Sequence, residues 1–454
     1  MKFAVVLPFA ALGSAFVLPD PNIFSQVAIH DHGEQHDEVP AKSSLASWLG
    51  DTLDYLPQAV RGGIHKLEDK FYDDLDTLSE EDEDDEYDIG FPLAKPHDGD
   101  KKHGHHLANL TIWEIISKSN HTTKFAKIVS EHEGIVELLN STKANHTLFV
   151  PVDSAFKHIP EDHEKPSDEF VEALLKYHIG LDAYPARDVI TAHTLPTVLN
   201  ESWLGDKPQR LRTRVGLGGW NVNFYSKIVA ANLPAKNGVI HAVNHILVPP
   251  PLVGRLLTLF PTRFSTLLLA YEKTDFVSFI HGVKLEGSTV FAPSNDAFAR
   301  LGPAANAFLF NTEKGIGYLR ALLKYHIVAN TTLYSDEIYR AEEEGGDVGI
   351  INGHTHVDLP SLLGDKSIAV DIARWKVFVR VTLNGYVPVT VQDGVAKNGV
   401  VHVVGRVPIP PHEHKGEGDD YDGGEISVDD LIARLAPYVD GEDGDDETEP
   451  AGEL

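Results

Sequence analysis

Histidine is the residue type that could give this chain chemistry, because 24 histidines and no cysteine occur among its 454 residues. Several histidines lie beside carboxylates, and imidazole and carboxylate groups together can bind zinc or copper. No spacing among them specifies a tetrahedral site, so we interpret these segments as solvated tracts and predict no metal site and no cofactor; weak metal binding is the alternative. The clustered histidines are His30, His32 and His36, then His103, His105 and His106, then His412 and His414.

Reactive side chains do not occur in the spacings that common enzymes use. The sequence contains no G-x-S-x-G, H-E-x-x-H or Walker loop. His132-Glu133 lacks a second histidine four residues after the first, and the glycines of 216–219 lack dinucleotide-site spacing, which indicates a turn between strands. Without a nucleophile placed beside a base, we predict that the protein is not an enzyme and keep catalysis as a remote alternative.

A tyrosine–histidine pair occurs near the end of the segment ALLKYHI in two places, as Tyr177-His178 and Tyr325-His326. Each pair follows two leucines in an apolar run, which indicates the end of a buried helix. We therefore expect both histidines to be buried, hydrogen-bonded and important for stability. A binding role for the two pairs is the alternative.

The elements that position these pairs recur as an internal repeat. The offset between the copies grows along the chain, which places about 6 and then about 13 extra residues in the second copy, the larger insertion near 341–354. Each copy spans roughly 140–160 residues, the size of one domain. The recurring blocks, at offsets of 142, 148 and 161, are TLFVPVDSAF (147–156) with TVFAPSNDAF (289–298), ALLKYHI (173–179) with its copy at 321–327, and AKNGVIHAVNHILVPP (235–250) with AKNGVVHVVGRVPIPP (396–411).

Each block predicts a local structure. The first is a β-branched and aromatic run stopped by proline, which is typical of a strand entering a turn. Asp153-Ser154 in one copy and Ser294-Asn295-Asp296 in the other then offer N-cap side chains for a helix that buries a phenylalanine. The third block follows an Asn-Gly turn and alternates as a hairpin strand does, until a double proline ends the pairing. Early helices and a late, partly antiparallel sheet place both copies in the α+β class.

These blocks, in this order, resemble the fasciclin (FAS1) domain family. Its first conserved segment is similar to TLFVPVDSAF and its copy, its Tyr-His pair to the two pairs above, and its second segment to the NGVIHAV and NGVVHVV blocks. The resemblance covers about 108–250 and 252–411 and implies two tandem FAS1-like domains, each a β-wedge or sheet with packed helices. The chain departs from the family pattern at Val152-Asp153-Ser154 and at Gly405-Arg406. Neither departure changes the expected fold.

The resemblance also implies a function. In animal relatives the Tyr-His motif has been associated with integrin-dependent adhesion, which makes Tyr177, His178, Tyr325 and His326 candidate binding residues, although no Arg-Gly-Asp tripeptide adds support. We expect a non-catalytic adhesion or binding protein whose partner is a cell-surface, cell-wall or matrix protein or glycan. A lumenal factor of the vacuole or another endomembrane compartment, acting in trafficking or membrane fusion, is the alternative.

Residues 1–15 contain one early lysine, an apolar run and small residues at its end, which is typical of a signal peptide. No later segment has the roughly 18 apolar residues of a transmembrane helix, and the C-terminus lacks the hydrophobic tail of a GPI anchor. We therefore expect a soluble protein, secreted or in the cell wall, or else in the vacuolar lumen. Six N-x-S/T sequons favour the secretory route. They lie at Asn109, Asn120, Asn140, Asn145, Asn200 and Asn330.

The formal net charge of −29 comes from the two ends of the chain. Residues 16–107 hold 22 acidic and 7 basic residues, residues 412–454 hold 16 and 2, and the segment between them holds 30 and 29. We interpret both ends as disordered acidic tails, with amphipathic helices expected over 43–71 and 426–439. The second helix would fold on a partner or dock on its own domains. Nucleic-acid binding needs clustered Lys and Arg, so a nearly neutral folded part predicts no nucleic-acid partner.

Overall fold

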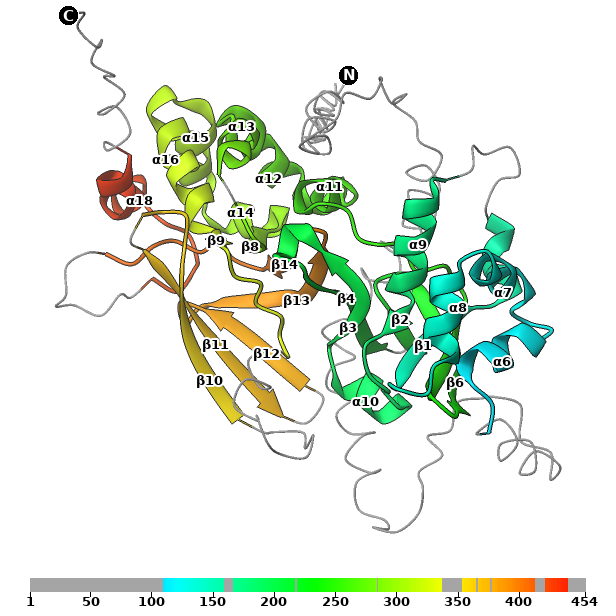
Figure 1. Cartoon of the computed structure of the whole chain (residues 1–454). Helices are drawn as coiled ribbons and strands as arrows, with labels where there is room; N and C mark the ends of the chain where they lie inside the picture. Colours follow the sequence, from blue (N-terminus) through cyan, green and yellow to red (C-terminus); the bar gives the residue numbers. More distant parts are fainter. Residues whose placement is uncertain are drawn as a thin grey trace, which may run out of the picture.

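Two domains follow each other in the computed structural model, and each combines helices with a sheet of seven strands (Figure 1). The α+β prediction is therefore confirmed. The predicted signal peptide, the acidic segment 16–107 with its helix at 43–71, and most of the predicted insertion at 341–354 lie outside the described residues. The structure describes residues 109–158, 166–216, 219–283, 285–336, 353–364, 366–375, 378–412 and 421–439.

The sheet of the first domain is a closed barrel. Its strands follow one another in chain order, and the last strand returns to pair in parallel with the first. All six residues of the first strand are buried, as expected for a strand covered on both faces. The strands are β1 (His146–Pro151), β2 (Ile179–Gly180), β3 (Thr194–Glu201), β4 (Lys207–Gly216), β5 (Gly219–Val222), β6 (Ser226–Ala235) and β7 (Gly238–Val243).

The helices of the first domain pack their apolar residues on β1 and β7, where Leu148 and Ile240 share one core with Ile112, Phe125 and Leu139. The prediction that Asp153 caps its own helix is wrong. Its carboxylate accepts hydrogen bonds from Thr123 Oγ1 (2.8 Å) and Lys124 N (2.9 Å), so it binds the start of a different helix. The helices are α6 (Ile112–Lys118), α7 (Thr123–Ser130), α8 (Glu133–Asn140), α9 (Asp168–Tyr177) and α10 (Ala186–Thr191), with 3-10 turns η1 (Asp153–His158) and η2 (Ser202–Leu204).

The second domain has longer helices, and its seven described strands follow the corresponding order β10-β11-β12-β13-β14-β8-β9 in a sheet that is not closed into a barrel. Its helices cover one end of the sheet, away from the hairpins of β10 to β12 (Figure 1). Ser294 caps α14 by accepting a hydrogen bond from Ala297 N, which confirms that prediction. The helices are α11 (Val253–Thr258), α12 (Pro261–Lys273), α13 (Phe276–Gly282), α14 (Asn295–Arg300), α15 (Pro303–Asn311) and α16 (Glu313–Tyr325). The strands are β8 (Ser288–Pro293), β9 (Ile327–Ala329), β10 (Gly353–Pro360), β11 (Ser367–Trp375), β12 (Phe378–Leu383), β13 (Val387–Ala396) and β14 (Gly399–Val404).

The three repeated sequence blocks become three neighbouring strands in each domain. β1 lies between antiparallel β2 and parallel β7, and β8 lies between antiparallel β9 and parallel β14. The Asn-Gly turn makes this approach possible. Gly238 and Gly399 have φ of +147° and +156°, and a Cβ on either would overlap the carbonyl oxygen of the first residue of the neighbouring strand.

A C-terminal helix docks on the second domain. Within the segment that the charge pattern assigned to the acidic tail, α18 (Val428–Leu435) and the turn η3 (Ala436–Tyr438) lie beside α15 and α16 (Figure 1). Ile426, Leu431 and Leu435 belong to the core of this domain. Of the two alternatives for the expected helix at 426–439, the structure shows docking on the chain's own domain.

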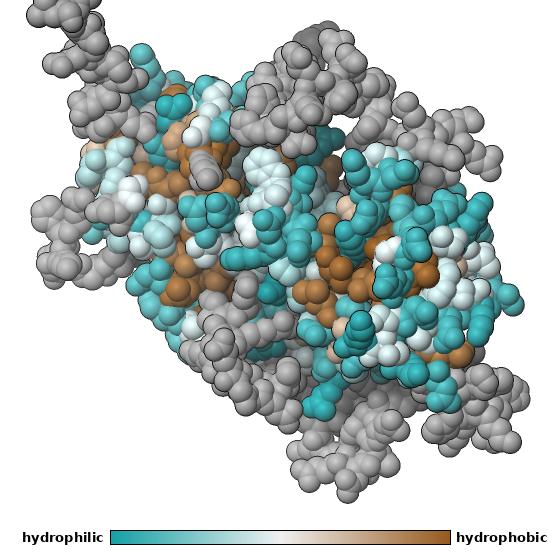
Figure 2. Space-filling view, in the orientation of Figure 1, coloured by the Kyte–Doolittle hydropathy of each residue, from teal (hydrophilic) through white to brown (hydrophobic). Residues whose placement is uncertain are grey.

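Apolar residues are visible on the surfaces of both domains, with polar residues around and between these patches (Figure 2). Among the described residues, no helix is both long and apolar enough to cross a membrane.

We predict that replacing Leu431 by Ala weakens the second domain. The side chain is fully buried, so its loss leaves a cavity and should lower the free energy of unfolding by about 2–5 kcal/mol. Urea unfolding of the full chain measures the change, and the exposed neighbour in Ala433→Ser serves as the control. Equal stability of the two variants would show that α18 contributes no core packing.

Candidate functional site

His178 of the first Tyr-His pair is a buried C-cap. It follows α9, and its ring Nδ1 lies 2.8 Å from the carbonyl oxygen of Leu174. Its Nε2 accepts a hydrogen bond from Leu247 N at 2.9 Å. Because Nε2 accepts, the proton of the neutral ring lies on Nδ1 and is donated to Leu174. The ring therefore joins the helix end to the segment that follows β7.

His326 occupies the same position after α16, with one bond fewer. Its Nδ1 hydrogen-bonds the carbonyl oxygen of Leu322, but its buried Nε2 has no hydrogen-bond partner among the described residues. The repeat explains this difference, since the residue that corresponds to Leu247 at the offset of 161 is Pro408. Proline has no backbone N–H and cannot donate.

The tyrosines of both pairs are buried too. Tyr177 Oη donates to Arg210 O at 3.0 Å, and Tyr325 Oη donates to Ser367 O at 3.2 Å. Both hydroxyls also accept from an asparagine in the turn before the last hairpin, Asn223 Nδ2 at 3.3 Å and Asn384 Nδ2 at 3.0 Å. The expectation that the histidines are buried is confirmed, since His178 is 0% and His326 2% exposed. Binding through these four residues stays a hypothesis, against which their burial argues.

The structure contains a second pair of buried histidines that the sequence analysis did not identify. His241 on β7 stacks on Phe149, and His402 on β14 stacks on Phe291, with ring centroids 5.4 and 5.7 Å apart. His241 Nε2 lies 2.9 Å from Tyr184 O, and His402 Nε2 lies 2.7 Å from the carbonyl oxygen of Leu333. The sequence does contain a sign of this pair, because both copies of the third repeated block have a histidine at the same position.

Burial keeps these rings neutral. Loss of hydration lowers the pKa of His178, His241 and His326 to about 4, and burial also lowers the pKa of His402. Burial likewise raises the pKa of Tyr177 well above its usual value. The four rings therefore act as hydrogen-bonding groups of the core, with no charge at neutral pH.

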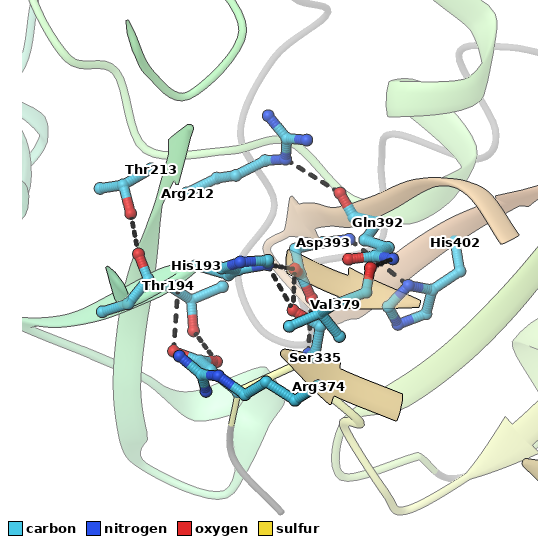
Figure 3. Close-up of polar contacts among 12 residues, drawn as sticks. His193, Thr194, Arg212, Thr213, Ser335, Arg374, Val379, Gln392, Asp393 and His402 are labelled. Carbon is cyan, nitrogen blue, oxygen red and sulfur yellow. Dashed lines mark hydrogen bonds and ion pairs between the residues drawn. The ribbon is translucent and has the colours of Figure 1, made fainter. Parts of the chain in front are cut away.

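A polar surface between the two domains gathers groups that the sequence analysis missed (Figure 3). Asp336 follows β9 and accepts hydrogen bonds from Thr194 N (3.1 Å) and Thr194 Oγ1 (2.7 Å) at the start of β3. His193 Nδ1 lies 3.1 Å from Ser335 Oγ and 3.9 Å from a carboxylate oxygen of Asp393. Asp393 also accepts hydrogen bonds from Ser335 N and Oγ. Both carboxylates are buried, and hydrogen bonds satisfy them.

Three arginines complete this interdomain surface. Arg212 Nε donates to Gln392 O at 2.9 Å, and Arg374 of the second domain donates back to Thr191 O at 2.7 Å. The guanidinium of Arg210 lies 4.7 Å from the ring centre of Tyr334 and 3.9 Å from Asp336. Burial lowers the pKa of Arg212 to about 10, which leaves it charged at neutral pH. A change in the relative placement of the two domains would leave buried charged and polar groups of this network unpaired, which is energetically costly.

The copies differ where the domains meet. The positions of Ser335, Asp336 and Asp393 in the second domain correspond to Ala186, Arg187 and Asn232 in the first. A comparison of the charged residues in the two copies could therefore have identified these residues of the second domain as unusual. It could not have identified the residues of the first domain that they contact.

The six predicted glycosylation residues are all described, whereas the clustered histidines, for which weak metal binding was only the alternative, are described in part. All six sequon asparagines lie on described, exposed positions, five of them in the first domain and Asn330 in the second. His412 Nε2 lies 2.7 Å from Asp430 Oδ1 of α18, so this histidine contacts a carboxylate of the docked helix. The other clustered histidines of the chain's ends lie outside the described residues.

We predict unequal effects of His178→Ala and His326→Ala. Both variants leave a helix carbonyl unpaired, but only the first also strands a buried N–H, that of Leu247. We expect the free energy of unfolding to fall by about 1–3 kcal/mol for His326→Ala and by about twice as much for His178→Ala. Hydrogen exchange of peptides from each domain measures the two losses separately. Full stability combined with lost partner binding would instead favour a binding role for these residues.

We predict that stability falls as the pH is lowered from 6.5 to 4. Above pH 6.5 the buried histidines are neutral in both states, whereas below it the unfolded chain binds protons that the folded chain excludes. Each ring should remove on the order of 3 kcal/mol by pH 4. Urea midpoints measured between pH 7.5 and 4.5 test this expectation, and His241→Gln should reduce the slope. A midpoint that does not change between pH 7 and 5 would contradict it.

The sequence is similar to those of several known proteins and matches one domain family twice. The fasciclin domain matches residues 120–249 and 262–410. "Aurofusarin biosynthesis cluster protein S" of Gibberella zeae is 29% identical over 365 residues, which cover 74% of this chain and 88% of that protein. "Transforming growth factor-beta-induced protein ig-h3" of Oryctolagus cuniculus is 30% identical over 278 residues, 60% of this chain and 34% of that protein.

Two further similarities involve fasciclin itself. "Fasciclin-1" of Schistocerca americana is 24% identical over 288 residues, 58% of this chain and 40% of that protein. The solved FAS1 domain pair of the insect cell adhesion molecule Fasciclin I is 17% identical, with a TM-score of 0.31, over 63% of this chain and 95% of that one. Because the fasciclin domain matches more than half of the chain, once in each of the two domains, this protein belongs to the fasciclin (FAS1) domain family.

Proposed function

We propose that this protein is a non-catalytic, secreted or lumenal binding protein that attaches to a protein or glycan of the cell surface, wall or matrix. Two FAS1 domains support this proposal, since domains of this family generally bind partners without catalysis. Fasciclin-1 and the transforming growth factor-beta-induced protein share these domains with the chain over about three fifths of its length. The chain spans 34% of the transforming growth factor-beta-induced protein and 40% of Fasciclin-1.

The observation that carries the proposal is the buried polar interface between the domains. Asp336 with Thr194, and Asp393 with Ser335 and His193, hold β3 of the first domain on the second. An interface of this kind keeps two surfaces at one distance and angle. A partner that contacts both domains then binds without ordering them first, which improves its affinity.

The sequons suggest which surface is left for the partner. Five of the six asparagines lie on the first domain, so occupied sites would cover that domain with glycan. Asn330 alone lies on the second domain. The second domain would then offer more uncovered protein surface for contact with the wall or matrix.

A second candidate function comes from the similarity to the aurofusarin biosynthesis cluster protein S, which extends over 88% of that protein. By this analogy the chain would be an auxiliary binding protein for the enzymes or intermediates of a biosynthetic pathway. This candidate predicts that deleting the gene changes a pathway product while wall attachment of the protein is negligible.

We predict that the tagged full chain partitions into the wall fraction and the medium, and that its mass falls on glycosidase treatment. The purified chain should bind isolated cell walls. Asp336→Ala removes the acceptor of the Thr194 N–H and hydroxyl and loosens the interface, so wall affinity should fall about tenfold if both domains are engaged. Glu137→Ala removes one acidic charge from an exposed position of α8 and is the matched control.

Two results would contradict this proposal. Recovery of the tagged protein from the vacuolar lumen, with no affinity for walls, would favour the endomembrane alternative. Equal wall affinity of Asp336→Ala and Glu137→Ala would show that the fixed domain arrangement does not serve binding.

A further inference from the structure

A crevice with apolar walls lies where the two domains are joined. Its walls come from the turn between β5 and β6 (Phe224, Tyr225), from the connecting prolines at 249–251, from α11 (Leu256) and from the residue before α12 (Phe260). The rings of Phe224 and Phe260 pack edge to face, with centroids 6.4 Å apart. The crevice has a volume of about 60 Å³. Since roughly 10–15 Å³ hold one water molecule, it admits a small ligand only.

Arg212 of β4 lines the same crevice, although it is only 6% exposed. Its Nε donates to Gln392 O, and its guanidinium lies 4.6 Å from the ring centre of Phe224. Nothing among the described residues accepts a hydrogen bond from Nη1 or Nη2, which point away from the other side chains in Figure 3. A guanidinium has five N–H groups, so those of both terminal nitrogens are left for a ligand or for water.

The charge of Arg212 has no close counter-charge. Burial lowers the pKa of Arg212 to about 10, so the group is still charged at neutral pH. Within the described part of the chain it forms no ion pair, and Asp393 attracts it only from a distance. A buried charge without a paired counter-charge is energetically costly, and a bound anion would remove much of this cost.

The second copy of the repeat shows that the fold does not require this arrangement. Ala369 corresponds to Arg212. Gly385 corresponds to Phe224, since each follows the asparagine with positive φ in its turn. The second domain therefore has neither the cation nor the aromatic wall at the equivalent place. The contact with Gln392 O needs a single N–H, which an uncharged side chain could also donate.

We propose that this crevice binds a small organic carboxylate, whose oxygens accept hydrogen bonds from Arg212 Nη1 and Nη2 and whose carbon chain lies against Phe224 and the prolines at 249–251. A planar guanidinium matches the two oxygens of a carboxylate. The apolar walls favour a ligand with a hydrocarbon part, because contact with it removes apolar surface from water. The volume limits the ligand to about the size of a four-carbon acid. This site is independent of the wall attachment proposed above.

Sodium butanoate is the probe, and ligand-observed NMR with the full chain measures its affinity at constant pH and ionic strength. Butanamide has the same size but no charge, so we expect it to bind at least about tenfold more weakly. Acetate has the charge but two methylene groups fewer, so it should also bind about tenfold more weakly.

Three variants separate the charge from the apolar wall. Arg212→Gln keeps a donor for Gln392 O but removes the charge, and butanoate affinity should fall at least about tenfold. Phe224→Ala keeps the charge and removes one wall, which should weaken binding about fivefold. Arg214→Gln removes the same charge from an exposed position of the same strand and is the matched control, so its affinity should stay unchanged.

Circular dichroism of the ligand-free variants checks their folding. If Arg212→Gln does not fold, Phe224→Ala and the three probes still test the site. Equal affinities for butanoate and butanamide would overturn the proposal, as would equal affinities of Arg212→Gln and Arg214→Gln. Equal affinities for acetate and butanoate would show a site for any small anion, which contradicts the proposed role of the apolar walls. A chain that binds no butanoate also overturns it.

Discussion

The parallel pairing of the first and last strands of each repeat is the constraint on which the structure depends. β1 with β7, and β8 with β14, bring together segments that are about 90 and 110 residues apart in sequence. Such non-local pairs form only when the intervening chain has closed a long loop, which is entropically costly. The cost is offset because the paired strands are almost completely buried and carry the apolar residues on which the helices pack.

Buried imidazoles link the elements around this pairing. His178 and His326 connect the helix ends to the sheet, and Phe149 N and Phe291 N donate to their carbonyl oxygens. His241 and His402 stack on those same phenylalanines from the neighbouring strand. Histidine suits these positions because one neutral ring can donate and accept on opposite sides within a tightly packed core. The same choice makes the core sensitive to acid.

The contacts between the two domains are made by residues that differ between the two copies of the repeat. Asp393 replaces Asn232, and its carboxylate faces His193 across the domain boundary. Arg210 and Arg212 of the first domain correspond to the uncharged Ser367 and Ala369 of the second domain. The first domain therefore brings the positive charges to the boundary, and the second domain brings the carboxylates. A buried network of this kind specifies an arrangement more than it stabilises one, because the desolvation of its charges cancels much of their attraction.

Much of the fold was determined by the sequence itself. The repeated blocks predicted the domain plan, the helix ends at Tyr177 and Tyr325, and the burial of His178 and His326, because local apolar patterns and turn residues act over short distances. Only the tertiary structure decided which groups meet across long distances. Asp153 binds the start of α7 instead of capping its own helix, α18 docks on the second domain, and Pro408 leaves His326 one donor short. Asp336 and Thr194 are 142 residues apart, and no local pattern encodes a contact between residues of two different domains.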